Sequence, residues 1–173
     1  LVTEGMRFTR CFQAAPMCSP TRHNIYTGLY PVKSGAWPNH TRTYPHVKSI
    51  VHHLQPLGYR VTQTGKTHIN PRTVFPFENM GGKNPDMKYI DRLFAETAIG
   101  GKDGKPFCLF ACSNEPHTPW DKGDASAYPP AKVKLPPYIV DTPRVREDFS
   151  KYLAEITYFD SQVGEILALL EKH

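Results

Sequence analysis

The chain has 173 residues, 39% of them hydrophobic and 21% charged, which is enough for one folded domain with a sizeable core. Its 9 Phe, 9 Tyr and 2 Trp side chains argue against disorder. No apolar run approaches the ~20 residues that span a bilayer, so no transmembrane segment is expected.

Positive charge is concentrated in the first part of the chain. Residues 1–77 hold nine Lys and Arg side chains against a single acid, Glu4, although the net charge of the whole chain is only +5. Such a segment suggests an anionic partner such as sulfate, phosphate, an acidic glycan or nucleic acid. The alternative is a solvated face whose acidic partners lie elsewhere in the fold. A nucleic-acid role has little support, because the sequence shows no recognised nucleic-acid-binding motif.

The first half of the chain is predicted to alternate between short strands and short helices. In chain order these are a strand at 7–13, a helix at 20–27, a helix at 47–54 and a strand at 60–63. The spacing i, i+3, i+4, i+7 of the apolar residues in 47–54 is typical of an amphipathic helix. Gly28 is predicted to end the first helix, and Gly65 to break the second strand.

The second half contains the clearest elements. They are a helix at 87–98, an apolar strand at 107–112, a proline-rich surface excursion at 116–143 and a helix that runs to the C-terminus. The strand is apolar throughout, which is typical of a strand covered on both faces, and its Cys108 and Cys112 are therefore predicted to be buried, inert thiols. Thr142-Pro143 provides a cap and a first-turn proline for the last helix, which could be ~45 Å long.

Strands that alternate with helices indicate an α/β fold, with a largely parallel (mixed) sheet sandwiched by helices. In such sheets the chemistry lies at the carboxyl ends of the strands. Polar loops follow three predicted strands, and the sheet could bring them to one edge; they are residues 14–22, 64–70 and 113–120.

The first of these loops contains Cys18-Ser19-Pro20-Thr21-Arg22. Pro20 favours a helix start, which would place Cys18 at the positive end of the helix dipole, with Arg22 one turn further on. A nucleophile beside a fixed cation suits an anionic substrate. The alternatives are a buried cysteine beside an ordinary helix arginine, or a Cys11–Cys18 disulfide.

The other two loops supply a lysine and two histidines. Lys66 and His68 in Gly65-Lys66-Thr67-His68 can point the same way on an extended segment, where they could bind an anion and exchange a proton. His117 lies between prolines just past the apolar strand and is a candidate acid or ligand. Each motif is weak alone, and an ordinary surface-loop histidine is the better interpretation of His117 taken by itself.

Together the three loops resemble the sulfatase family of the alkaline-phosphatase-like superfamily. Cys18-Ser19-Pro20-Thr21-Arg22, followed by Thr27-Gly28, matches the family signature, with Tyr26 where that signature usually has Leu. Gly65-Lys66-Thr67-His68 and Pro116-His117-Thr118-Pro119 match two further family motifs in the family's order. Residues 65–77 and 137–143 look most like the heparan N-sulfatases (sulfamidases).

The resemblance implies a mechanism. Cys18 would be oxidised to formylglycine by a separate maturation enzyme, and a hydroxyl of the hydrated aldehyde would attack sulfur. Arg22 and Lys66 would hold the sulfate and the diol, His68 would take the diol proton, and His117 would assist the leaving group. His40 is expected at the mouth of the pocket as a substrate contact, whereas His46, His52 and His53 are expected on a helix surface.

The resemblance also implies a divalent cation, usually Ca²⁺, for which only Cys18, as formylglycine, could contribute a ligand here. Residues 1–173 are therefore expected to form a central segment of one sulfatase catalytic domain, incomplete and inactive on its own. The acidic ligands would lie on strands that precede and follow the segment. Its edges could favour an oligomer, and the family context implies export to the periplasm or outside the cell, or a lysosome.

Two other functions are left open. The protein could be a phosphonate monoester or phosphodiester hydrolase of the same superfamily, or a non-catalytic segment that binds sulfated glycans through charge. A comparison of activity on a sulfate ester with activity on a phosphate diester would discriminate between a sulfatase and a phosphodiester hydrolase. Asn39-His40-Thr41 is also a formal glycosylation sequon, a triplet that is common by chance.

Overall fold

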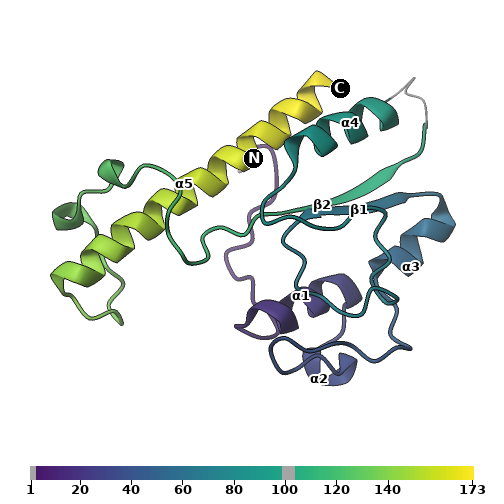
Figure 1. Cartoon of the computed structure of the whole chain (residues 1–173), viewed down its shortest axis with the longest axis horizontal. Helices are drawn as coiled ribbons and strands as arrows, with labels where there is room; N and C mark the ends of the chain where they lie inside the picture. Colours follow the sequence, from purple (N-terminus) through teal and green to yellow (C-terminus); the bar gives the residue numbers. More distant parts are fainter. Residues whose placement is uncertain (1–2, 99–103) are drawn as a thin grey trace. The chain divides into compact units, whose positions relative to one another are not determined.

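The computed structural model describes residues 3–98 and 104–173 (Figure 1). It consists of two compact units. The first unit runs to Val61 and resumes at His68–Phe77; the second comprises Thr62–Thr67 and Glu78–His173.

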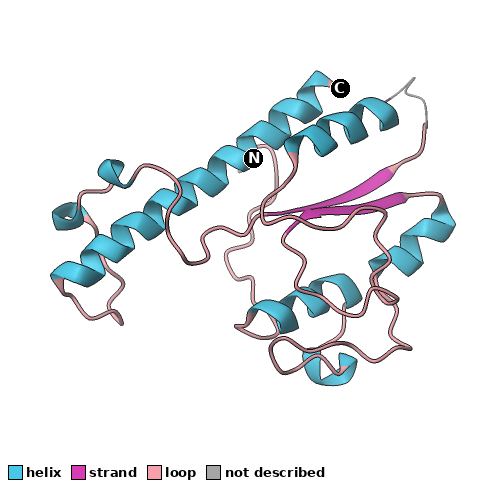
Figure 2. Ribbon diagram, viewed as in Figure 1, coloured by secondary structure: helices cyan, strands magenta, loops and turns pink. Residues whose placement is uncertain are grey.

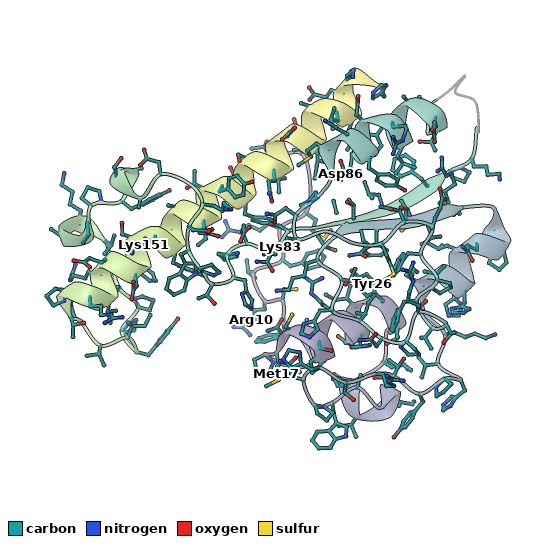
Figure 3. All side chains as sticks on the ribbon, in the orientation of Figure 1. Arg10, Met17, Tyr26, Lys83, Asp86 and Lys151 are labelled. Carbon is teal, nitrogen blue, oxygen red and sulfur yellow. The ribbon has the colours of Figure 1, made fainter. Side chains whose placement is uncertain are left out.

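The first unit is built from short helices joined by loops. They are α1 (Cys18–Thr27), α2 (Pro31–Ser34), α3 (Ile50–Leu54) and a 3-10 turn, η1 (Gln55–Leu57). Gly28, at a φ of 68°, ends α1 as predicted, because a left-handed residue stops the helix there. Tyr26 of α1 packs edge-on against Phe77, with ring centroids 5.2 Å apart, and its side chain is buried (Figure 3).

The first unit differs from the sequence prediction in three places. Residues 7–13 form no strand, and Phe8 and Phe12, spaced for one face, are exposed. A strand is stable only when a neighbour pairs with its backbone, and the hydrophobic pattern alone does not supply that neighbour. The α1 helix begins at Cys18 rather than Pro20, and α3 begins at Ile50, which leaves Val47 buried outside it.

Among the residues that the structure describes, the sheet contains two strands, β1 (Arg60–Gly65) and β2 (Phe107–Cys112), drawn in magenta in Figure 2. The strands are parallel: the residue after β1, Lys66, donates its backbone N–H to the carbonyl of Cys112 at the end of β2, at 2.8 Å. Parallel strands among helices confirm the α/β class. The loops that follow β1 and β2 therefore begin side by side, as the sequence suggested for two of the three polar loops.

The core of the second unit lies between β2 and two helices, α4 (Met87–Thr97) and α5 (Pro143–Lys172). Its centre is Ile90, Leu93 and Phe94 of α4, all buried, with β2 and α5 residues packed around them. Asp86, at the start of α4 in Figure 3, accepts two backbone N–H groups of the first turn. Helix and strand bounds here agree with the prediction to within one residue, apart from the longer β1.

The long helix α5 begins as predicted, with Thr142 accepting the backbone N–H of Val145. Two 3-10 turns in the proline-rich excursion, η2 (Ala125–Ala127) and η3 (Pro130–Lys132), pack on its first half. Its predicted apolar stripe is only partly covered, since Ile156, Phe159 and Leu170 are each more than a third exposed. None of the helices in the described parts of the chain is long and apolar enough to cross a membrane.

The prediction of full burial for β2 was wrong. All six of its residues are half-buried, because the α4 core covers the face that carries Phe107, Leu109 and Ala111, while the alternate residues lie on the other face. Cys108 and Cys112 are accordingly half-buried free thiols, and partial burial raises the pKa of Cys108.

Candidate functional site

Cys18 is the first residue of α1, directly after the N-cap Met17 (Figure 3). Its side chain is half-buried and its thiol is free, as is that of the exposed Cys11, so the two do not form a disulfide. A helix N-terminus carries a partial positive charge that stabilises an anion at this position. Arg22 follows one turn later on the same helix, as predicted.

His68 lies directly against Cys18, with its Nδ1 2.9 Å from the sulfur. Its other ring nitrogen, Nε2, lies 2.8 Å from Nδ1 of His40. The structure therefore brings together three of the predicted site residues, from segments that are distant in the sequence. Both histidines have left-handed backbones, with φ of 51° at His68 and 59° at His40, a conformation that costs a non-glycine residue roughly 1–2 kcal/mol. Tertiary contacts must hold both residues in that conformation.

Sequence reasoning missed His23, a buried histidine that organises this cluster. Its Nδ1 lies 2.7 Å from the carbonyl of Ser19, and its Nε2 accepts the backbone N–H of Asn70 at 3.0 Å. Its ring also packs edge-on against Phe75. His23 thereby ties α1 to the loop that carries His68. The signal for it was its position three residues before the apolar Tyr26, on the same face of the helix.

Asn39 was also missed, because the sequence marks it only as the first residue of a glycosylation sequon. Its Oδ1 accepts the backbone N–H of Ser19 at 3.3 Å, and its Nδ2 lies 3.1 Å from Nε2 of His40. The backbone N–H groups in the first turn of a helix have no partner within the helix, so Asn39 supplies one from outside it.

Lys66 and His117 belong to the second unit. Lys66 is fixed at the end of β1 by its backbone bond to Cys112, and its carbonyl accepts the side chain of Gln63 at 2.7 Å. His117 is exposed in the loop after β2, with Nδ1 2.7 Å from the Thr118 carbonyl. Both follow the carboxyl ends of neighbouring parallel strands, where the sequence predicted them.

The remaining histidines of the first unit have other surroundings. His52 lies in the first turn of α3, where its Nδ1 accepts the backbone N–H of Ser49 at 3.2 Å. His53 is exposed on the same helix, as expected, whereas His46 lies outside any helix and stacks on Tyr44.

A buried carboxyl in the second unit was not predicted. Glu155 of α5 is fully buried and accepts the backbone N–H of Lys122 at 2.7 Å, while its Oε2 has no well-aligned partner among the described residues. Burial, and to a smaller extent the nearby Glu115 carboxyl, raise the pKa of Glu155. This residue joins α5 to the segment that follows His117.

A cavity of about 470 Å³ lies between the proline-rich excursion and the first half of α5. Trp120, Phe149 and Tyr152 line it, with ring contacts between Trp120 and Tyr152 at 5.8 Å. The indole of Trp120 also donates to the Pro116 carbonyl at 3.2 Å, so one wall of the cavity is fixed to the loop that carries His117.

The described residues, 3–98 and 104–173, contain no cluster of three or more His, Cys, Asp or Glu side chains that could hold a metal ion. Residue 18 is the one ligand that the family resemblance assigns to this chain, and a single ligand does not build a Ca²⁺ site, which takes six to eight oxygens.

Comparison with known proteins agrees with the motifs. The sequence profile of the family described as Sulfatase matches residues 1–173. The chain belongs to the sulfatase family. An ulvan-active sulfatase of Formosa agariphila is 30% identical over 100% of this chain and 36% of its own length. The human N-sulphoglucosamine sulphohydrolase is 24% identical over 96% of this chain and 40% of its own.

Solved structures confirm the sulfatase fold. A sulfatase from a study of glycosaminoglycan metabolism by Bacteroides thetaiotaomicron superimposes with a TM-score of 0.77 over 95% of this chain and 48% of that one, at 20% identity. Ps i-CgsB in complex with k-i-k-neocarrahexaose gives a TM-score of 0.67 over 92% of this chain and 46% of that one, also at 20% identity. This sulfatase chain thus spans less than half the length of these relatives.

Proposed function

We propose that the full-length protein hydrolyses the sulfate esters or sulfamates of sulfated glycans through residue 18. The observation that carries this proposal is the placement of Cys18, within the family signature, at the N-terminus of α1 with an imidazole 2.9 Å from its sulfur. Relatives that bear the names of ulvan-active and N-sulphoglucosamine enzymes support a glycan substrate.

Formylglycine, made from Cys18 by a maturation enzyme, supplies a hydroxyl nucleophile and lets sulfate leave as the aldehyde re-forms. The surroundings of Cys18 suit an oxygen-bearing side chain, because a helix N-terminus and an imidazole nitrogen both face it. Arg22 and Lys66 would bind the sulfate oxygens, an electrostatic role that often dominates catalysis. His117 would protonate the leaving group.

The substrate within this class is proposed from the motif resemblance to sulfamidases. The full-length protein, co-expressed with a formylglycine-generating enzyme, should release sulfate from N-sulfoglucosamine faster than from 6-O-sulfated N-acetylglucosamine. The opposite preference would keep the sulfatase function and overturn the sulfamidase assignment. Faster turnover of a phosphate diester than of either sulfate would favour the phosphodiesterase alternative.

Residue 18 itself is tested by substitution and mass spectrometry. A peptide that contains residue 18 should show conversion to formylglycine, and Cys18→Ala should reduce sulfate release to background while the protein remains folded. Cys11→Ala is the matched control, because Cys11 is a free and exposed thiol. Full activity without conversion of Cys18 would contradict the proposal, and binding of heparin without any turnover would favour the non-catalytic alternative.

A further inference from the structure

The loop that carries His117 is anchored at its first end by one side-chain amide. Asn84 Oδ1 accepts the Ser113 hydroxyl at 3.0 Å and the Asn114 backbone N–H at 2.9 Å. A peptide N–H can only donate, so this contact fixes the amide with its oxygen toward the loop and its NH₂ toward Glu115. That NH₂ donates to Oε1 of Glu115 at 2.8 Å. Asn84 therefore holds the start of the loop, directly after β2, in one conformation.

The other end of the loop is anchored to α5. The buried Glu155 accepts the Lys122 backbone N–H at 2.7 Å through Oε1. One residue further on, Gly123 lies so close to the helix that an added Cβ would be 2.3 Å from the carbonyl oxygen of Ala154. The segment that follows His117 is thereby packed directly on α5 at the level of Glu155.

His117 moves with this loop, because its ring is bound to the loop itself. Its Nδ1 donates to the carbonyl of the next residue, Thr118, at 2.7 Å, since a carbonyl can only accept. Trp120 donates its indole N–H to the Pro116 carbonyl at 3.2 Å, which draws the loop together around His117. The position of the imidazole therefore depends on the two anchored ends of the loop.

The two ends meet at a pair of carboxyls, Glu115 and Glu155. Oε2 of Glu155 is buried and finds no donor among the described residues, while the Glu115 carboxyl is close enough to interact with Glu155 through a side-chain hydrogen bond. Two ionised carboxylates can only accept, so such a bond requires a proton on one of them. Glu115 already accepts the Asn84 amide and lies near the Lys122 ammonium, and both neighbours suit a negative charge. The proton therefore belongs on Oε2 of Glu155.

We propose that Glu155 is a positioning residue whose Oε2 keeps a proton and donates it to the Glu115 carboxylate, which closes the base of the His117 loop. When Glu155 loses this proton, two negative charges face each other and the loop is released from α5. The catalytic consequence rests on the proposed function, in which His117 protonates the leaving group. Misplacing a catalytic group by ~1 Å can cost roughly 10²-fold in rate.

The direction of the pH dependence follows from the surroundings of Glu155. Burial, and then the Glu115 carboxyl, raise its pKa above the ordinary 4.5, against the opposing effect of the Lys122 and Asp121 backbones. The folded state therefore binds the proton more tightly than the unfolded state, so the carboxyl pair is intact below pH 4.5 and is lost as the pH rises through the folded pKa. The other titratable groups that interact here are the Lys122 side chain, which pairs with Asp121 at 3.2 Å, and Tyr158 of α5.

The proton on Glu155 can be observed directly by NMR. In full-length protein labelled with ¹³C at its glutamate carboxyls, one carboxyl carbon should titrate at a higher pH than those of exposed glutamates, and it should be missing from the spectrum of Glu155→Gln. If no carboxyl carbon titrates late, the proposal is overturned without any variant, whether the two carboxyls separate or bind a cation. A late carbon that persists in Glu155→Gln would overturn it equally.

Glu155→Gln makes the same contact without a proton. The Lys122 N–H selects the amide oxygen, so the NH₂ faces Glu115 and donates to it at any pH. Hydrogen–deuterium exchange of a peptide spanning residues 113–122 should be equal in variant and wild type near pH 4, and slower in the variant above the ionisation of Glu155. Residue 155 lies outside this peptide, so its intrinsic exchange rate is the same in both proteins. Equal exchange at the higher pH would overturn the proposal.

The pH profile of activity separates positioning from stability. Above the ionisation of Glu155, kcat/KM for sulfate release should be roughly tenfold higher in Glu155→Gln than in wild type, because the variant keeps His117 in place. Identical alkaline limbs would overturn the positioning role. Glu165→Gln, exposed on the same helix, is the matched control and should keep the wild-type profile. If the NMR and exchange results are as expected but no protein releases sulfate, the proposed function fails and the anchoring of the loop stands, so the two failures are distinguishable.

Discussion

Gly65 lies where the two strands of the sheet end together, and its substitution tests that geometry. Its φ is +85°, and a Cβ built there would lie 1.9 Å from the carbonyl oxygen of Cys112, far inside van der Waals contact. Gly65→Ala therefore cannot be accommodated unless the strand ends separate. That separation would break two backbone hydrogen bonds, Lys66 N to Cys112 O at 2.8 Å and Gly65 N to Gly81 O at 2.7 Å.

The cost follows from these two effects. The left-handed backbone costs alanine roughly 1–2 kcal/mol, and two lost hydrogen bonds cost about 0.5–1.5 kcal/mol each, so Gly65→Ala should lower the free energy of unfolding by about 2–5 kcal/mol. Gly58→Ala is the matched control: its φ is +86°, yet nothing lies within 4 Å of the added Cβ, so only the first cost applies. Urea unfolding of full-length protein measures both variants. Equal losses in the two variants would refute the close approach of Gly65 to Cys112.

Glu155→Gln should raise the free energy of unfolding at pH 8, because the amide replaces a carboxyl that is costly to ionise in a buried site, and leave it unchanged near pH 4. Burial raises the pKa of this carboxyl above its ordinary 4.5, so the folded state binds the proton more tightly and stability is lost as the pH rises from 4.5 through the folded pKa. Glu165→Gln, on the exposed side of α5, should leave the free energy of unfolding unchanged at both pH values. If the Glu155 and Glu165 variants changed it equally, the burial argument would be contradicted. His23→Leu should lower the free energy of unfolding, measured in urea, by about 1–3 kcal/mol, because it leaves the Asn70 N–H without its acceptor. A loss below about 0.5 kcal/mol would contradict the role of His23 in holding the site together. Asp86→Ala should lower the free energy of unfolding by about 0.5–2 kcal/mol, because it removes the N-cap of α4. Asp86→Asn should keep most of that stability, since asparagine also caps helices. An equal loss in both variants would point to a role other than capping.

Several elements are encoded locally, and the sequence alone predicts them well. The apolar run 107–112 becomes β2 with the predicted bounds, and Thr142-Pro143 starts α5 where a cap and a first-turn proline should. The residues from Cys18 to Arg22 identify the family and place the cysteine at a helix N-terminus, because that motif is contiguous in the chain.

The hydrogen-bonded site could not be read in the same way. The start of α1 is contacted by residues that lie 20 to 50 positions further along the chain, namely Asn39 and His68. Nothing in the local sequence of either residue says which atoms will meet. The same limit explains the failed strand at 7–13, since alternating apolar residues describe a face but not the partner strand that must pair with it.

The sequence by itself determined most of the elements, the family and the candidate nucleophile, because helix capping, apolar periodicity and a five-residue motif act between near neighbours. Tertiary structure alone decided that His23 fastens the His68 loop to α1, that Gly65 must be glycine, and that His40 and His68 meet beside residue 18. The physical reason is that hydrogen-bond direction and steric contact depend on where distant atoms finally lie, and only folding brings those atoms within reach of one another.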